Sequence, residues 1–273
     1  MSVDEFAERV SAHYTPAHLM QAFESVLEAR AKDSGRITPD DLAPVDQFHF
    51  GGAQATIELA ALAELGRDTR VLDIGGGFGG PARTLADSFG CPVTVLDLTE
   101  VYCDVGEKLT ARCGLQDLVS FQQGNGLAIP FADRSFDRVW TQHSSMNIAD
   151  KQQLYREIHR VLRPGGRLAL YEVMAGSAKP LHFPVPWAAE ASISFLSTPG
   201  AVRQLLADTG FRALVWEDMT DVAAEAMRAQ PMTAEMPGLH LILGDGFLER
   251  ARNMARNFAE HRAALIRAVL ERP

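Results

Sequence analysis

The ten residues from Val71 to Gly80, which read VLDIGGGFGG, decide the fold. The first four are mostly apolar and predict a buried strand. Five of the next six are glycines and predict a loop, after which Pro81 suits the first turn of a helix. Glycine adopts backbone angles that other residues avoid, and it lets a ligand lie against the main chain. The stretch therefore predicts a strand–loop–helix unit that binds a small molecule.

Two classes of ligand compete for this loop. Gly75, Gly77 and Gly80 match the GxGxxG pattern of dinucleotide-dependent oxidoreductases, and Asp97 follows at a suitable distance. Asp73 argues against a pyrophosphate, because a carboxylate two residues before the first glycine would repel an anion. The same carboxylate favours a cation, such as a sulfonium with a free ammonium group. Asp97 could accept both ribose hydroxyls in either case. A glycine-rich turn without any ligand is the third alternative.

Around this unit, short apolar segments alternate with amphipathic ones. The alternation predicts a doubly wound, mostly parallel α/β sheet, with ligands at the carboxyl ends of its strands. The segment 264–270 is ambiguous, because its composition favours a helix whereas its apolar run suits a closing strand. The expected strands are 71–74, 92–98, 119–122, 138–141, 167–173 and 211–216, and the expected helices are 53–65, 81–89, 100–113, 151–162 and one from Pro199 to Gly210.

The rest of the chain divides around this alternating core. Residues 1–52 predict an N-terminal helical cap, in which a polar stretch with Pro39 and Pro44 follows the last long helical run. Residues 53–273 form the expected core. Within it, 174–197 contains three prolines and predicts a lid insertion, and the methionine-rich part 219–273 predicts a second lid with a closing segment.

Composition and charge restrict the partners. The 273 residues include 26 Lys and Arg against 35 Asp and Glu, which gives a net charge of −9. This balance argues against nucleic acid and anionic membranes as partners. No apolar run reaches the roughly 18 residues that span a bilayer, and the N-terminus lacks the apolar region of a signal peptide. The three cysteines lack metal-site spacing and predict reduced thiols in a cytoplasmic protein without a metal. Oligomeric state cannot be predicted from these features.

Four motifs in order resemble the class I S-adenosylmethionine-dependent methyltransferases, over about residues 47–216. They are VLDIGGG at 71–77, Asp97, GNGLAIPF at 124–131 with DRSFD at 133–137, and LRPGGR at 162–167. More narrowly, DQFHFGG at 46–52 and WTQHSSMNI at 140–148 resemble the branch of sarcosine and dimethylglycine N-methyltransferases, whose core is similar to that of sterol and natural-product methyltransferases. The resemblance implies a seven-stranded Rossmann-like sheet of order 3-2-1-4-5-7-6, with Ala264–Leu270 as the antiparallel seventh strand.

The resemblance also implies S-adenosylmethionine as cofactor and S-adenosylhomocysteine as product. Backbone at Gly75–Gly77 would hold the methionine part, Asp97 the ribose, and 125–127 the adenine. The family usually has an acidic residue at the position of Asn125, but the asparagine side-chain carbonyl can still accept a hydrogen bond from the adenine amino group. The expected cofactor-binding residues are Asp73, Gly75, Gly76, Gly77, Asp97, Leu98, Asn125, Gly126, Leu127, Gln142 and His143.

His143 follows the expected fourth strand, where cofactor and acceptor should meet. It is the first choice for a catalytic base or an acceptor-orienting group, and the equal alternative is a contact with the methionine part of the cofactor. His49 suits a capping or structural role. His182 either reaches the acceptor or is solvated. Glu172 ends the fifth strand and suits a structural hydrogen bond better than a place in the site.

The expected reaction is in-line methyl transfer to a nitrogen, oxygen or carbon atom of a small molecule. Between Arg167 and Arg203 the only Lys or Arg is Lys179, whereas the insertion carries Phe183, Trp187 and Phe195. Methionines in the C-terminal part add adaptable apolar surface. This content favours a larger, partly apolar acceptor over a small zwitterion. The competing functions are a nicotinamide-dependent oxidoreductase and a non-catalytic S-adenosylmethionine-binding module.

Overall fold

The computed structural model describes residues 23, 37–230, 233, 244 and 246–273. The helical runs expected before residue 37 lie outside this part, apart from Phe23, which is buried against Phe78. The strands are β1 (Val71–Ile74), β2 (Val93–Asp97), β3 (Val119–Gln123), β4 (Phe136–Gln142), β5 (Leu162–Ala175), β6 (Arg212–Asp218) and β7 (Ala263–Glu271). The helices are α3 (Pro39–Asp46), α4 (Gly52–Leu62), α5 (Gly80–Phe89), α6 (Glu100–Arg112), α7 (Lys151–Val161), α8 (Pro199–Asp208), α9 (Thr220–Ala229) and α11 (Gly246–Ala259), with short 3-10 turns η1 (Ser145–Asn147) and η2 (Ala191–Ile193).

The seven strands form one sheet in the order β3-β2-β1-β4-β5-β7-β6, as the family resemblance implied. The pairs of β1 with β2 and β4, of β2 with β3, and of β4 with β5 are parallel. Strand β7 runs antiparallel between β5 and β6. The ambiguous segment 264–270 is therefore a strand. Its apolar run is explained by burial on both faces, since all but one of its residues are buried.

Two hydrophobic clusters lie on opposite faces of the sheet, because successive strand residues point to opposite sides. Along β1, Val71 belongs to one cluster and Leu72 to the other. The first cluster includes residues of α4, α5 and α6, and the second includes residues of α7 and α8. The sheet is thus a middle layer between two layers of helices.

Helix α3 corrects the prediction of a polar stretch with Pro39 and Pro44. Both prolines lie inside an eight-residue helix. Pro39 occupies the first turn, where its missing N–H costs nothing. Thr38 and Asp41 form a reciprocal capping box, in which each side chain accepts from the other residue's backbone N–H. The cap and the burial of Leu42 and Val45 stabilise this helix although Pro44 cannot donate one intrahelical bond.

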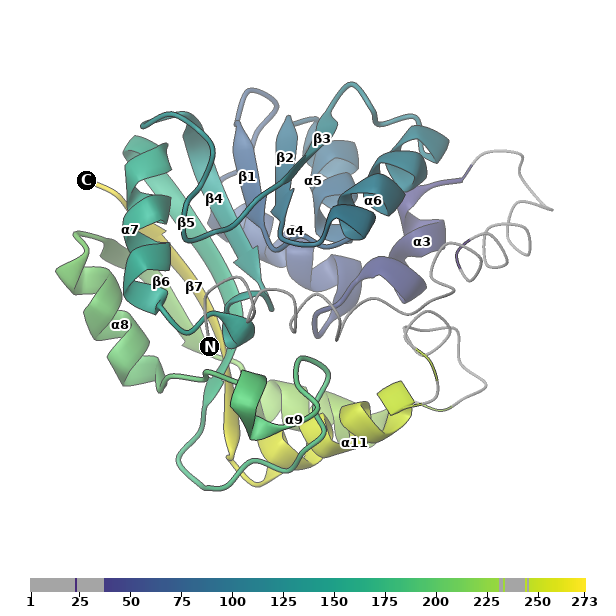
Figure 1. Cartoon of the computed structure of the whole chain (residues 1–273), viewed down its shortest axis with the longest axis vertical. Coiled ribbons are helices and arrows are strands. Elements are labelled where there is room, and N and C mark those ends of the chain that lie inside the picture. Colours follow the sequence, from purple (N-terminus) through teal and green to yellow (C-terminus); the bar gives the residue numbers. More distant parts are fainter. Residues whose placement is uncertain (1–22, 24–36, 231–232, 234–243, 245) are drawn as a thin grey trace.

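Helices α9 and α11 lie beyond the carboxyl ends of the parallel strands, in the lower part of Figure 1. Between β5 and α8, residues 176–198 are irregular apart from η2 and one bridge that pairs Val185 with Ala188. Among the described residues, no helix is long and apolar enough to cross a membrane. These connecting segments and the two C-terminal helices place additional side chains at the ligand-binding edge of the sheet.

Candidate active site

A cavity of about 910 Å³ opens at the carboxyl ends of β1, β2, β3 and β4. Its volume lies near the upper end of the roughly 300–1,000 Å³ typical of small-molecule sites. All of the expected cofactor-binding residues line it: Asp73, Gly75, Gly76, Gly77, Asp97, Leu98, Asn125, Gly126, Leu127, Gln142 and His143. The fold therefore brings together side chains that lie at the ends of four separate strands.

The glycine loop after β1 packs directly on the loop after β4. Gly75 has a φ of +70°, and a Cβ added there would lie 2.5 Å from the Cβ of Ser144. A Cβ on Gly76 would lie 2.5 Å from the Oδ2 of Asp73. Both contacts are too short for any side chain. Close approach therefore favours glycine at both positions, and at Gly75 the left-handed backbone angle favours it as well.

Asp73 carries a buried carboxyl group at the cavity wall. It is 1% exposed, and its Oδ2 has no hydrogen-bond partner. Burial, together with the nearby charge of Asp97, raises the pKa of Asp73 to about 8. A cationic ligand would stabilise the charged form and remove this cost. The sulfonium and ammonium groups of S-adenosylmethionine fit that requirement, whereas a pyrophosphate does not.

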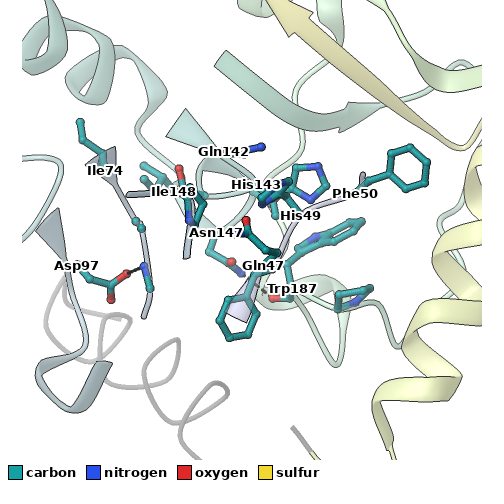
Figure 2. Close-up of a pocket in the computed structure, with 18 of the residues that line it drawn as sticks. Gln47, His49, Phe50, Ile74, Asp97, Gln142, His143, Asn147, Ile148 and Trp187 are labelled. Carbon is teal, nitrogen blue, oxygen red and sulfur yellow. Dashed lines mark hydrogen bonds between the residues drawn. The ribbon is translucent and has the colours of Figure 1, made fainter. Parts of the chain in front are cut away.

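Asp97 ends β2 with its carboxylate held by two backbone donors. Its Oδ2 accepts from the N–H of Gly77 and its Oδ1 from the N–H of Thr99, each at 2.9 Å (Figure 2). The Thr99 side chain and the Leu98 backbone also hydrogen-bond to this carboxylate, whose oxygens are the kind of acceptor that a ribose hydroxyl requires. Asn125 is oriented similarly, because its Oδ1 accepts from the N–H of Leu127 at 2.9 Å. Both residues are preorganised as acceptors, and their contacts with ribose and adenine stay predictions.

His143 is held in an unusual backbone conformation at the end of β4. Its φ is +51°, and its N–H donates to the carbonyl of Tyr171 at 2.8 Å. Its Nε2 is buried without a hydrogen-bond partner. Burial, and then the neighbouring ring of His49 at 6.2 Å, lower the pKa of His143 well below its usual value. At neutral pH the ring is uncharged, so its Nε2 is free to form a hydrogen bond with a ligand, but the lowered pKa makes it a weaker base than an ordinary histidine.

A buried network fixes the side chain of Gln142 beside it. The Nε1 of Trp140 can only donate, so the Gln142 oxygen must face it at 2.9 Å. Thr56 donates to the same oxygen at 3.2 Å and also contacts the Nε2 of His49. The Nε2 of His49 donates to the carbonyl of Gly52. Burial lowers the pKa of His49 to about 4, so this histidine is neutral at pH 7. It also lines the cavity, and its capping or structural role stays a prediction.

The opposite end of the cavity is apolar. Figure 2 shows Asp97 and Ile74 at one side of the view, and Phe50 and Trp187 at the other, with Gln142, His49 and His143 between them. Helices α9 and α11 and the segment after β5 also contribute to the cavity wall. The large apolar side chains among the lining residues include Phe50, Trp187, Phe195, Met227, Phe247 and Met254.

Some residues singled out in the sequence lie elsewhere. His182 does not line the cavity; its Nε2 pairs with Glu260 at 2.9 Å, which ties the segment after β5 to α11. Glu172 is fully buried and accepts from the backbone of Ser144 and Ser145, which confirms the structural hydrogen bond. Two of the methionines of the C-terminal part, Met232 and Met236, lie outside the described residues.

Sequence reasoning missed one contact and one residue of the site. Gln142 was expected, but its hydrogen bond from Thr56 was not, because the two residues are 86 positions apart and no local spacing links them. Arg252 of α11 is an exposed cation that lines the cavity, in a segment where no motif marks it. Neither Lys179 nor any other lysine is among the lining residues of the described chain.

Comparison with known proteins also points to a methyltransferase. A family profile described as a methyltransferase domain matches residues 72–170. The methyltransferase GfsG of Streptomyces halstedii is 30% identical over 209 residues, which cover 74% of this chain and 72% of that protein. A sarcosine/dimethylglycine N-methyltransferase of Halorhodospira halochloris is 34% identical over 157 residues, covering 58% of this chain and 56% of that one.

Solved structures agree on the fold. A geranyl diphosphate C-methyltransferase from Streptomyces coelicolor A3(2), in complex with S-adenosyl-L-homocysteine, superposes with a TM-score of 0.73 at 16% identity, over 98% of both chains. The chain spans only 32% and 56% of the length of the sarcosine-type N-methyltransferases it matches. Sheet order, cavity position and similarity over most of a relative's length agree: the chain belongs to the class I methyltransferases, the family that uses S-adenosylmethionine as methyl donor.

Proposed function

We propose that the chain transfers a methyl group from S-adenosylmethionine to a small-molecule acceptor. The observation that carries this proposal is the unpartnered carboxylate of Asp73 beside the glycine loop, in the same cavity as the acceptor oxygens of Asp97. A carboxylate with a raised pKa is a poor neighbour for a diphosphate and a good one for a ligand with two positive charges. The site residues expected from the sequence are the ones we assign to the cofactor.

The sulfonium of the cofactor supplies an already activated methyl group. The protein's part is then to align the acceptor and to exclude water, which can be worth about 7–11 kcal/mol. The aromatic and methionine side chains at the far end of the cavity suit water exclusion. We assign His143 to orientation of the acceptor or removal of its proton, since its neutral Nε2 has no partner in the protein.

The proposed acceptor is a partly apolar small molecule. Support comes from the apolar end of the cavity and from relatives that are named as a sterol 24-C-methyltransferase as well as N-methyltransferases. Arg252 is exposed and adds a cation to the cavity lining, which suits an acidic or phosphorylated substituent on the acceptor. Nitrogen, oxygen and carbon all stay open as the methylated atom.

We assign residues 1–52 to a cap, 53–273 to the catalytic core, and 174–197 and 219–273 to two lids over the cavity. Support comes from Trp187 and Phe195 of the first lid and from Met227 and Met254 of the second, all of which line the cavity. We further propose a cytoplasmic location, because all three cysteines are buried free thiols.

The test is calorimetric titration of the purified chain with S-adenosylhomocysteine, run beside NADH. Binding of S-adenosylhomocysteine alone is the expected result, and it justifies a screen of apolar acceptors beside sarcosine and dimethylglycine. Binding of NADH alone would overturn the proposal and our assignment of Asp73. Binding without any methyl transfer across the screen would favour a non-catalytic cofactor-binding protein.

A further inference from the structure

The loop after β4, residues 143–150, forms one wall of the cavity. His143, Ser144 and Asn147 belong to it, and all of its residues except Ser145 line the cavity. Ser144 lies against Gly75 of the cofactor loop, so closely that a Cβ added to Gly75 would come within 2.5 Å of the Ser144 Cβ. The position of this β4 loop therefore affects the shape of the cavity both beside the glycine loop, which we call the cofactor end, and at the opposite apolar end with Phe50 and Trp187, which we call the acceptor end.

A buried carboxylate holds the first part of the β4 loop. Glu172 on β5 has no exposed surface. Its oxygens accept from the N–H and the Oγ of Ser144 at 3.3 Å, and from the N–H of Ser145 at 3.1 Å. Two backbone groups and one hydroxyl of this turn thus donate to the same side chain.

A buried ammonium holds the second part. Lys151 begins α7 and is 7% exposed. Its Nζ donates to the carbonyls of Ser145 and Ile148, both at 2.9 Å. Burial lowers the pKa of Lys151 to about 8, against the opposing effect of Glu172, so the ammonium form persists at neutral pH. The N–H of Ser145 consequently donates to the carboxylate of Glu172, and the carbonyl of Ser145 accepts from the ammonium of Lys151.

The same loop is joined to the segment after β5. The Nδ2 of Asn147 donates to the carbonyl of Trp187 at 2.8 Å (Figure 2). It also donates to the carbonyl of Ile193 at 2.8 Å. Trp187 lines the apolar end of the cavity. A shift of the β4 loop would therefore move the acceptor end together with the cofactor end.

The stability of the folded chain does not by itself explain why Glu172 and Lys151 are buried as ionisable groups. Buried charges are expensive to desolvate, and apolar residues of similar volume are often as stabilising. Glu172 and Lys151 both form hydrogen bonds with backbone groups of the same loop, and neither residue lines the cavity. Their arrangement is understandable if the position of that loop is what matters.

We propose that Glu172 and Lys151 are positioning residues for methyl transfer, which hold the β4 loop through its N–H groups and its carbonyl groups, respectively, and so keep it in register with the glycine loop. They act through Ser144 and Ser145 and do not touch cofactor or acceptor. This inference rests on the proposed function, because the register of the two loops matters only if a ligand binds between them.

The test compares S-adenosylhomocysteine affinity in four variants with wild type, at pH 7 and well below the unfolding temperature. Lys151→Met removes the charged donor, Lys151→Arg retains it, and Glu172→Gln keeps the shape but removes the charge. Lys108→Met is the matched control, because Lys108 is exposed on α6 and does not line the cavity. Circular dichroism and thermal unfolding establish that each variant is folded.

We expect Lys151→Met and Glu172→Gln to weaken binding about tenfold, the effect of one or two lost ligand hydrogen bonds in a displaced loop. Lys151→Arg should recover most of the loss, and Lys108→Met should match wild type. Variants that bind as wild type and differ only in unfolding temperature would overturn the positioning role. Glu172→Gln is the milder change and decides the question if Lys151→Met does not fold. A wild type that does not bind would refute the proposed function instead.

Discussion

Gly75 and Gly165 offer a controlled test of the close approach between the glycine loop and the β4 loop. Both have left-handed backbone angles, with φ of +70° and +74°. A Cβ on Gly75 would lie 2.5 Å from the Cβ of Ser144, whereas a Cβ on Gly165 meets no atom within 4 Å. Alanine at the two positions therefore adds the same backbone strain, but only one of the substitutions adds a steric conflict.

The magnitudes follow from these two terms. Left-handed strain costs about 1–2 kcal/mol, and loss of the glycine's freedom in the unfolded chain offsets about 0.4–1 kcal/mol of it. Gly165→Ala should thus lower the free energy of unfolding by about 1 kcal/mol, or about 2–4 °C in unfolding temperature. Gly75→Ala adds overpacking of about 1–3 kcal/mol, because carbon atoms normally stay about 3.5–4 Å apart.

The assay is thermal unfolding of both variants, followed by calorimetric titration with S-adenosylhomocysteine. Gly75→Ala should be the less stable variant and should lose at least about tenfold in affinity, since its loop must move away from Ser144. Gly165→Ala should bind as wild type. Equal affinities in the two variants would refute the reasoning, because the loops would then tolerate a separation that the structure excludes.

Three further predictions concern single side chains. Asp97→Ala should weaken binding of S-adenosylhomocysteine in the same titration, and unchanged affinity would contradict the ribose assignment. His143→Ala should slow turnover at saturating cofactor, and a loss confined to cofactor affinity would exclude the catalytic role. Asp73 contributes stability when protonated, because its pKa is raised to about 8 in the folded chain, so this contribution is complete below its ordinary pKa and declines as pH rises towards 8. Asp73→Asn should therefore gain unfolding temperature relative to wild type between pH 4 and 8 in the ligand-free state, while its affinity for S-adenosylhomocysteine falls; a constant difference across that range would contradict the raised pKa.

The parallel half of the sheet could be predicted from the sequence because its signals are local. Strand β1 coincides with the expected 71–74, and helix α6 ends within one residue of the prediction. Apolar runs, glycine loops and N-terminal caps all lie within a few positions of the elements they specify. Segment 264–270 was undecided because its strand character comes from neighbours far away in the chain, namely β5 and β6.

The same distinction applies to the site. The end of the cavity that we assign to the cofactor is formed by residues at or just after the ends of strands, such as Asp97 and Asn125, and topology alone brings them to one edge. The hydrogen bonds that orient the side chains of this edge come from distant positions. Thr56 and Gln142 are 86 positions apart, and Ser144 and Glu172 are 28 positions apart. Their spacing in the sequence therefore does not predict that they form hydrogen bonds.

The acceptor end was the least predictable part, and this has a physical reason. Its walls come from the segment after β5 and from α9 and α11, whose apolar residues could equally be packing residues of an ordinary core. His182 illustrates the ambiguity: it could have reached an acceptor, yet it pairs with Glu260 and fastens one segment to another. A side chain in such a lid has two possible partners, the neighbouring lid segment or the ligand, and only the packing of the folded chain decides between them. The selectivity of this methyltransferase for its acceptor is therefore expected to depend on Trp187, Met227 and Arg252, which line the cavity, and to be insensitive to substitution of His182.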